Sequence, residues 1–353
     1  MVGWFVARRS IQLSYGRADG CLQTVRENAA FPRYHTPKSR TFETLARLTR
    51  YDAQLAGLRC DKLAVTLFMD LPDQHGETIV KRFLLAAIFA ALLGRSSTPE
   101  YSIQAIRYAS SPGVPVSELV VGGPKDEKVD IAMVVWLIRG GGHAILFDSG
   151  FHRDTFLKYF PMVNYLRPDE AVKTAGVQPE AITDIVISHA HWDHMGGIDL
   201  FPKADVWIQK EEYRYYTTQA WQPGGQHGGV DPEDVKQLLQ LNIEGRIHLV
   251  DGDNVEIFPG IRSHTGSRHT YASQYLRVDG NPPFVLASDN CYLYLNLSSH
   301  LASATFSEAD HAANIAAQSR MIDLAGSPDR VVPGHDALQF KKFPAQGRVA
   351  KIK

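Results

Sequence analysis

Six consecutive residues near the middle of the chain concentrate side chains that bind metal ions. His189, His191, Asp193 and His194 fall within Ser188-His-Ala-His-Trp-Asp-His194, after a short β-branched run and before Gly196-Gly197. Because side chains alternate along an extended chain, His189 and His191 are expected to point the same way, and Asp193 and His194 can turn to a neighbouring point. About four ligands satisfy one zinc ion. The segment therefore predicts a metal site.

Four further motifs accompany this segment in a fixed order. They are Leu146-Phe-Asp148-Ser-Gly150, Gly266-Ser-Arg-His269-Thr-Tyr, Leu286-Ala-Ser-Asp289-Asn and Pro333-Gly-His335-Asp336. Together the five motifs resemble the metallo-β-lactamase superfamily, whose hallmark is H-x-H-x-D-H, over about residues 100–345. The resemblance implies an α/β fold, the αββα sandwich, with a dinuclear metal site at the sheet edge.

The resemblance also implies which residues hold the metals. His189, His191 and His269 would hold one ion, Asp193, His194 and His335 the other, and Asp289 would bridge them. Asp148 and, by the same reading, Asp336 would support the ligand loops without binding metal. We expect two Zn²⁺ per chain, although iron, cobalt or manganese would accept the same nitrogen and oxygen ligands.

The third histidine ligand has one rival in the sequence. His264 precedes His269 by five residues, but the small polar stretch after His269 matches the family pattern. The Pro-Gly that the family usually carries around this histidine is replaced by Ser267-Arg268. We predict that His269 is the ligand.

The residues after Asp289 narrow the chemistry. Typical metallo-β-lactamases lack a bridging Asp, whereas Tyr292, three residues after Asp289, resembles the tyrosine of N-acyl homoserine lactonases. That likeness implies a quorum-quenching lactonase, in which a metal-bridging hydroxide attacks the lactone carbonyl. Tyr292 would stabilise the oxyanion and Asp193 would pass a proton to the leaving oxygen. A β-lactamase or a glyoxalase-type thioesterase on the same site is the alternative, and an ordinary packing role for Tyr292 stays open.

Alternating strands and helices position these residues. Apolar runs at 131–138 and 144–147, separated by Arg139-Gly-Gly-Gly142, predict a hairpin of strands. Helices are expected near Lys210 with Tyr213 and Tyr216 in the core, over 232–241, and over 307–324 with Ser307 as its cap. Trp192 and the glycine-rich loop 222–229 are placed to flank a pocket that an acyl chain could enter. No internal repeat appears, so we predict one metallo-hydrolase domain over 98–353.

The start of the chain has a different character. Residues 1–79 are rich in arginine and show no sustained period, which predicts a leader that is not part of the enzyme and is not necessarily translated. Lys81-Arg82, the eleven apolar residues 83–93 and Gly94-Arg95-Ser96 resemble a secretory signal within residues 80–97. Eleven residues are too few to span a bilayer. We expect export to the periplasm or medium, or a cytoplasmic protein if this segment is a core helix.

The charge distribution bears on partners. Residues 1–97 carry 14 Lys and Arg against 8 Asp and Glu, whereas the remainder carries 23 against 30. An acidic body argues against a nucleic-acid substrate, because phosphate binding needs clustered cations. We therefore expect a small-molecule substrate, no nucleic acid and no stable membrane insertion, and the sequence leaves a homodimer open.

Overall fold

The computed structural model describes residues 99–157 and 160–353. The predicted leader at 1–79 and the signal-like segment at 80–97 lie outside the described residues. Within the described part of the chain, no helix is both long and apolar enough to cross a membrane.

Strands with apolar side chains on both faces form the centre of the fold. β2 (Lys128–Gly140) contains the apolar run predicted from the sequence, with Trp136 and Ile138 on one face and Val135 and Leu137 on the other. All four side chains are fully buried. A strand buried on both faces belongs to an inner layer. The run is therefore continuously apolar because β2 has no face toward water.

Two sheets account for the strands of residues 99–353. The first has the order β12 (Ala345–Gln346), β13 (Val349–Lys351), β1 (Ser102–Pro115), β2, β3 (His143–Phe147), β4 (Asp184–Val186), β5 (Asp205–Gln209) and β6 (Ile247–Val250). The second has the order β11 (Val331–Pro333), β10 (Phe284–Ser288), β9 (Gln274–Val278), β8 (Ile261–Thr265) and β7 (Val255–Phe258). Strands β3 to β6 are parallel to one another, and β10 is parallel to β11.

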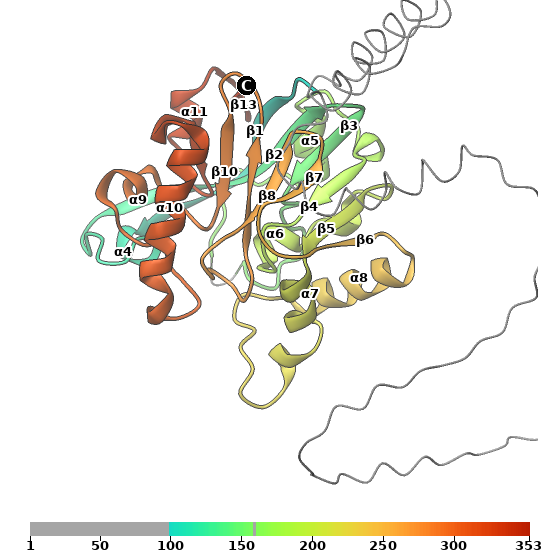
Figure 1. The fold of residues 1–353 in the computed structure, drawn as a ribbon, viewed down its shortest axis with the longest axis horizontal. Helices are drawn as coiled ribbons and strands as arrows, with labels where there is room; N and C mark the ends of the chain where they lie inside the picture. The colour runs from blue at the N-terminus through green and yellow to red at the C-terminus, as the bar shows by residue number, and fades with distance from the viewer. Residues whose placement is uncertain (1–98, 158–159) are drawn as a thin grey trace, which may run out of the picture. The chain divides into compact units, whose positions relative to one another are not determined.

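Helices cover the outer face of each sheet. Figure 1 shows α9 and α10 on the side of β10, and α7 and α8 on the side of β5 and β6. The α-helices are α4 (Val116–Leu119), α5 (Pro168–Lys173), α6 (Trp192–Met195), α7 (Lys210–Tyr216), α8 (Pro232–Ile243), α9 (Tyr294–Ser299), α10 (His311–Ala325) and α11 (Gln339–Lys342). Short 3₁₀ turns are η1 (Pro179–Ala181), η2 (Ile198–Leu200), η3 (Gln219–Trp221), η4 (Glu308–Asp310) and η5 (Pro328–Arg330).

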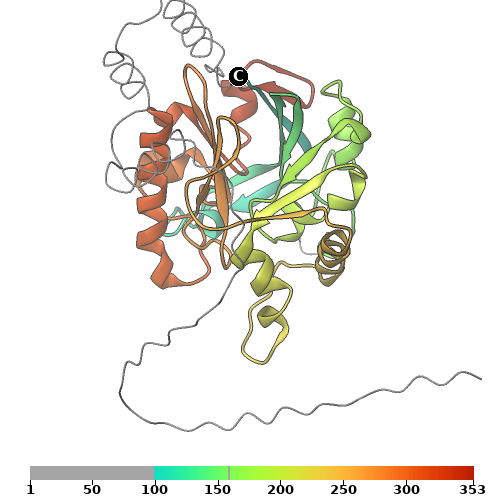
Figure 2. The same cartoon turned by 45° about the vertical axis from the view of Figure 1, so that its right-hand side comes forward.

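Three apolar layers separate these elements. Trp136 and Phe147 of the first sheet meet Leu276 and Leu286 of the second between the sheets. The outer face of the first sheet packs on α5 to α8, and that of the second on α9 and α10. The order helix, sheet, sheet, helix is the αββα sandwich that the motifs predicted (Figure 2).

The predicted helices are present, with one correction. α7 begins at Lys210 and buries Tyr216, whereas Tyr213 is only partly buried against the core, and α8 begins at Pro232. Ser307 does not cap a helix over 307–324, because residues 308–310 form the 3₁₀ turn η4 and α10 begins only at His311. The Ser307 hydroxyl donates to the Asp310 carboxylate at 2.6 Å, and it accepts no backbone N–H of the first turn.

Candidate metal centre

The predicted metal ligands stand just after strand ends at one edge of the sandwich. β4 leads into Ser188 and the histidine segment, and the parallel strands β10 and β11 lead into Asp289 and His335. His269 lies in the loop between β8 and β9. Side chains that follow the carboxyl ends of neighbouring parallel strands share an edge. The sheet registers therefore bring together residues up to 146 positions apart in the printed sequence.

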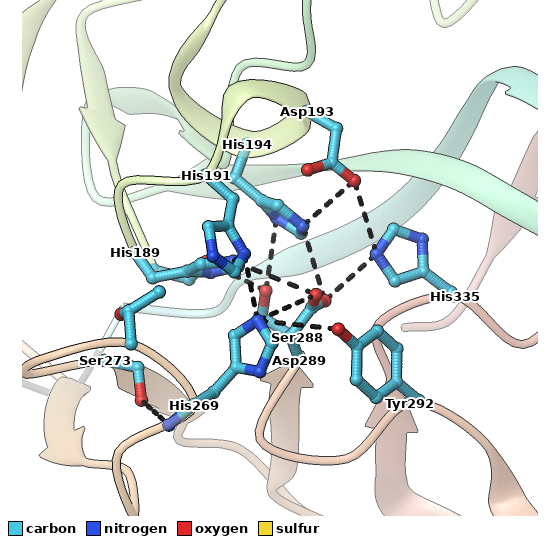
Figure 3. A network of polar contacts seen from close by, with 12 residues as sticks. His189, His191, Asp193, His194, His269, Ser273, Ser288, Asp289, Tyr292 and His335 are labelled. Carbon is cyan, nitrogen blue, oxygen red and sulfur yellow. Dashed lines mark hydrogen bonds and ion pairs between the residues drawn. The ribbon is translucent and has the colours of Figure 1, made fainter. Parts of the chain in front are cut away.

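The seven side chains converge as two groups around neighbouring points (Figure 3). One group is His189, His191, His269 and Asp289, and the other is Asp193, His194 and His335; within each, one ligand atom per residue lies within 4.8 Å of the others. Asp289 faces both groups. Its Oδ2 lies 3.4 Å from His269 Nε2, and its Oδ1 lies 3.0 Å from His335 Nε2.

A short helix separates the two groups. His191 has an extended backbone and forms the N-cap of α6, whose single turn contains Asp193 and His194. The turn directs these two side chains to the second group, while the His194 ring stays 4.1 Å from the His189 ring between centroids. The local geometry predicted from the spacing is thus present, with a helical turn where the sequence suggested a loop.

Hydrogen bonds outside the cluster aim the ring nitrogens inward. His269 Nδ1 lies 2.8 Å from the Ala304 carbonyl, and His335 Nδ1 lies 3.0 Å from the Ala132 carbonyl. A carbonyl oxygen only accepts, so each Nδ1 carries the proton and each Nε2 directs a lone pair into the cluster. His194 does the same by donating from Nδ1 to Asp148 Oδ2 at 2.8 Å. This is the arrangement that metal-binding histidines adopt.

The cluster contains buried carboxylates that form no ion pair with Lys or Arg among the described residues. Asp148, Asp193 and Asp289 are buried or nearly so, and the ion pairs found for them in the described residues all involve histidines. His194 Nε2 and Asp289 Oδ1 lie 3.3 Å apart, yet neither has a hydrogen-bond partner within the described part of the chain. A lone pair and a carboxylate that face each other repel unless a proton or a metal ion lies between them. The donor set fits a divalent metal ion.

The pKa shifts favour the metal-binding form at two of the ligands, whereas at His194 and His335 burial is outweighed by the charges of Asp289 and the other nearby carboxylates, which raise the pKa of each ring. Burial and the neighbouring His269 lower the pKa of His191 to about 3, so its ring is neutral at pH 7. Burial opposes the charge on Asp289, but His335 and His194 hold the pKa of its carboxyl well below the usual range. Metal ligands must be deprotonated, so little proton release would accompany binding at these two residues.

Asp148 connects the ligand segment to β3 and β10. Its carboxylate accepts from the Ser188 N–H at 2.7 Å and from the hydroxyls of Ser188 and Ser288 at 2.9 Å each, besides His194. Ser188 Oγ in turn lies 2.8 Å from His189 Nδ1. One buried carboxylate therefore orients a histidine of each group. Asp148 thus has the contacts expected of a residue that supports these candidate ligands.

Asp148→Asn is expected to weaken metal binding by about 10–100-fold while the fold persists. Asn tolerates the left-handed backbone at this position, where φ is 63°. Its NH₂ group, however, must face either the Ser188 N–H or the His194 Nδ1–H, and both are donors. Metal affinity measured by chelator competition checks this. Ser288→Ala, which removes one donor and leaves the carboxylate, is the control, and an equal loss in both variants would contradict the role of Asp148.

The rival histidine lies elsewhere. His264 is on β8, stacked on Tyr275, with its Nδ1 3.1 Å from Arg320 Nη2. Its side chain faces the layer beneath α10, because residues of one strand alternate between the two faces of a sheet. The structure brings His269, and not His264, to the cluster.

A cavity of about 630 Å³ opens onto the two groups. His191, Asp193, Asp289, Tyr292 and His335 line its polar end. Its apolar wall consists of Val114, Leu119, Ile131, Met133, Phe156, Phe160, Met162 and Trp192. Trp192 and Gly228-Gly229 line it as predicted, whereas β1, β2, α4 and the side chains Phe156, Phe160 and Met162 were not foreseen, because nothing in their sequence signals a pocket. An apolar cavity with few polar groups at one end suits a ligand with an apolar chain.

Tyr292 lies between histidines of both groups. Its hydroxyl is 3.5 Å from His269 Nε2, and its ring stacks on His335 with centroids 5.5 Å apart. Burial, followed by the charge of Asp289, raises the pKa of the phenol well above its usual value. The hydroxyl therefore stays protonated and can donate to an oxygen in the cavity.

Comparisons with known proteins agree with this geometry. Residues 133–279 match the family model of the metallo-β-lactamase superfamily. The N-acyl homoserine lactonase AttM of Azorhizobium caulinodans is 28% identical over 198 residues, which cover 53% of this chain and 72% of the relative. The N-acyl homoserine lactonase AiiB of Agrobacterium fabrum is 24% identical over 187 residues, covering 48% and 66%. The chain thus spans slightly less than two thirds of the second relative.

Solved structures share the fold. AiiA of B. thuringiensis, in a variant with N-decanoyl-L-homoserine bound, superposes with a TM-score of 0.56 at 19% identity, covering 68% of this chain and 95% of that one. A probable metal-dependent hydrolase from Staphylococcus aureus has a TM-score of 0.57 at 15% identity, covering 68% and 91%. At these identities the likeness concerns the fold alone.

The fold, the family match and the converging His and Asp side chains together indicate the class of protein. The protein is a metal-dependent hydrolase, and its residues 133–279 match the metallo-β-lactamase superfamily model. The matched range includes the residues from His189 to His269 but ends before Asp289, Tyr292 and His335, which only the tertiary structure brings to the site.

Proposed function

We propose that this protein opens lactone rings of the N-acyl homoserine lactone type, a quorum-quenching activity, using two zinc ions. One would be held by His189, His191 and His269 and the other by Asp193, His194 and His335, with Asp289 shared. The observation that carries the proposal is the partly buried Tyr292 hydroxyl at the polar end of an apolar cavity. The names of the curated relatives support the same substrate class.

The chemistry divides between the ions and the chain's own residues. Divalent ions would polarise an ester carbonyl and lower the pKa of water. Tyr292 would donate a hydrogen bond to the carbonyl oxygen as negative charge develops there. The apolar wall would hold the acyl chain and keep water from the reacting ester except at the polar end.

Asp193 is placed to move a proton. Its Oδ2 lies 3.5 Å from His194 Nε2 and 3.6 Å from His335 Nε2, and its carboxylate lines the cavity. Burial opposes its charge, yet the histidines lower its pKa below the ordinary value. Asp193 would accept a proton from the attacking water and return it to the ring oxygen as the C–O bond breaks. The products are a hydroxyl and a carboxylic acid, and the acid releases its proton to solvent to become a carboxylate, so atoms and charge balance.

A substrate panel tests the proposal. Zinc-loaded full-length protein should show its highest kcat/KM with N-acyl homoserine lactones, well above nitrocefin and a glutathione thioester. Lengthening the acyl chain should raise kcat/KM about fourfold per methylene while the chain fits the cavity, because each buried methylene contributes about 0.8 kcal/mol. Faster turnover of nitrocefin or of the thioester would favour those alternatives and contradict the lactonase proposal.

A further inference from the structure

A buried carboxylate outside the cluster joins the two loops that carry three of its histidines. Glu212 of α7 is fully buried. Its Oε1 accepts from the Ala190 N–H at 2.9 Å and from the Thr270 hydroxyl at 2.6 Å, and its Oε2 accepts from the Ala272 N–H at 2.6 Å. Ala190 stands between His189 and His191, and Thr270 follows His269. A single side chain thus contacts both loops next to their histidines.

The two loops have no sheet hydrogen bonds at Ala190 and Ala272, because both residues lie outside the strands. The histidines must nevertheless meet closely, since His191 Nδ1 lies 3.0 Å from both His189 Nε2 and His269 Nε2. Metal ions tolerate only small errors in ligand position. A fixed distance between the two loops is therefore a requirement of this group.

Burying the carboxyl group of Glu212 has a free-energy cost. The ion pairs of the described residues include none with Glu212, and burial raises its pKa to about 7 against the effect of its three donors. A neutral residue of similar length would fill the same volume without placing a carboxyl group in the interior. The three hydrogen bonds, two on one oxygen and one on the other, are what a neutral side chain could not reproduce.

We propose that Glu212 is a positioning residue of the metal centre, which holds the His189–His191 loop and the His269 loop at the separation that lets the three rings share one ion. The inference rests on the proposed function only in taking these histidines as metal ligands. It does not depend on which substrate the enzyme hydrolyses.

Glu212→Gln in the full-length chain tests this. A glutamine has one acceptor oxygen, so either Ala272 N–H or the Ala190 and Thr270 donors must face an NH₂ group. With zinc alone as the probe, chelator competition should show one binding step weakened by about 10–100-fold. The other step should keep its affinity, because no hydrogen bond joins Glu212 to Asp193, His194 or His335 in the described structure.

A second pair of variants distinguishes weaker zinc binding from a folding defect. Thr270→Val removes one donor to Glu212 and keeps the side-chain shape, whereas Thr270→Ser keeps the hydroxyl. Thr270→Val should weaken the same zinc step by a smaller factor, and Thr270→Ser should leave it near the wild-type value. Melting temperatures with and without zinc separate the two roles, because weaker binding reduces the rise in Tm that zinc produces.

The outcomes are distinct. A reduced zinc-induced rise in Tm for Glu212→Gln and Thr270→Val, with little change in the metal-free Tm, supports the inference. An equal loss of Tm with and without zinc, at unchanged zinc affinity, would show an ordinary structural role and overturn it. Wild-type protein that binds two zinc ions but hydrolyses no lactone would contradict the proposed substrate and leave the Glu212 result intact.

Discussion

Asp289→Ala protein is expected to retain about one metal ion in place of two and to lose lactone turnover almost completely. The loss should exceed the ~10²-fold typical of residues that only support ligands. The reason is geometric, because the two carboxylate oxygens of Asp289 face different groups, Oδ1 toward His335 and Oδ2 toward His269. Without this carboxylate, the two groups have no side chain in common. The negative charge that would attract both metal ions also decreases by one.

Elemental analysis and steady-state turnover of the same preparation measure this effect. Asp184→Asn is the matched control, since the Asp184 carboxylate is also buried but contacts Thr183, His143 and Trp207 and none of the seven side chains in the described structure. It should keep both metals and most of the activity. A fully active Asp289→Ala enzyme with a single metal would contradict the shared role of Asp289.

Tyr292→Phe is expected to keep both metals and to lower kcat by about 10²–10³-fold, with a smaller change in KM. Loss of one oxyanion donor typically has this size. The effect should fall on kcat because the hydrogen bond strengthens as charge develops on the carbonyl oxygen. Phenylalanine preserves the packing on His335 and His269, so a structural defect is not expected.

Lactone turnover and metal content of purified protein measure the Tyr292 effect. Tyr294→Phe is the control, because Tyr294 is two residues further along and its ring lies beside Lys342, away from the cavity that Tyr292 lines. Unchanged kcat in Tyr292→Phe would return Tyr292 to a packing role. It would also remove the observation on which the lactonase proposal depends.

The sequence by itself determined the parts of this protein that depend on short-range geometry or on recognisable motifs. His189 to His194 lie within six residues, and the chain needs only a strand end and one turn to direct them to two neighbouring points. The apolar run of β2 indicates a strand buried on both sides, and the order of the five motifs predicted the αββα sandwich. These features are local, or repeat across a family, and so they can be read from residue types and spacing.

Other features were decided only by the tertiary structure, because they depend on which distant segments become neighbours. Pairing of β3 with β4 places Asp148 beside Ser188, where it orients both His189 and His194. Much of the apolar wall of the cavity comes from β1, β2, α4 and the side chains Phe156, Phe160 and Met162. The sequence predicted α7 from its tyrosines but did not single out Glu212. The role of Glu212 depends on the loops after β4 and β8, which both donate hydrogen bonds to its carboxylate. A contact between segments 22 and 58 residues apart leaves no periodic trace in the chain, since it is set by the packing of a helix on a sheet edge.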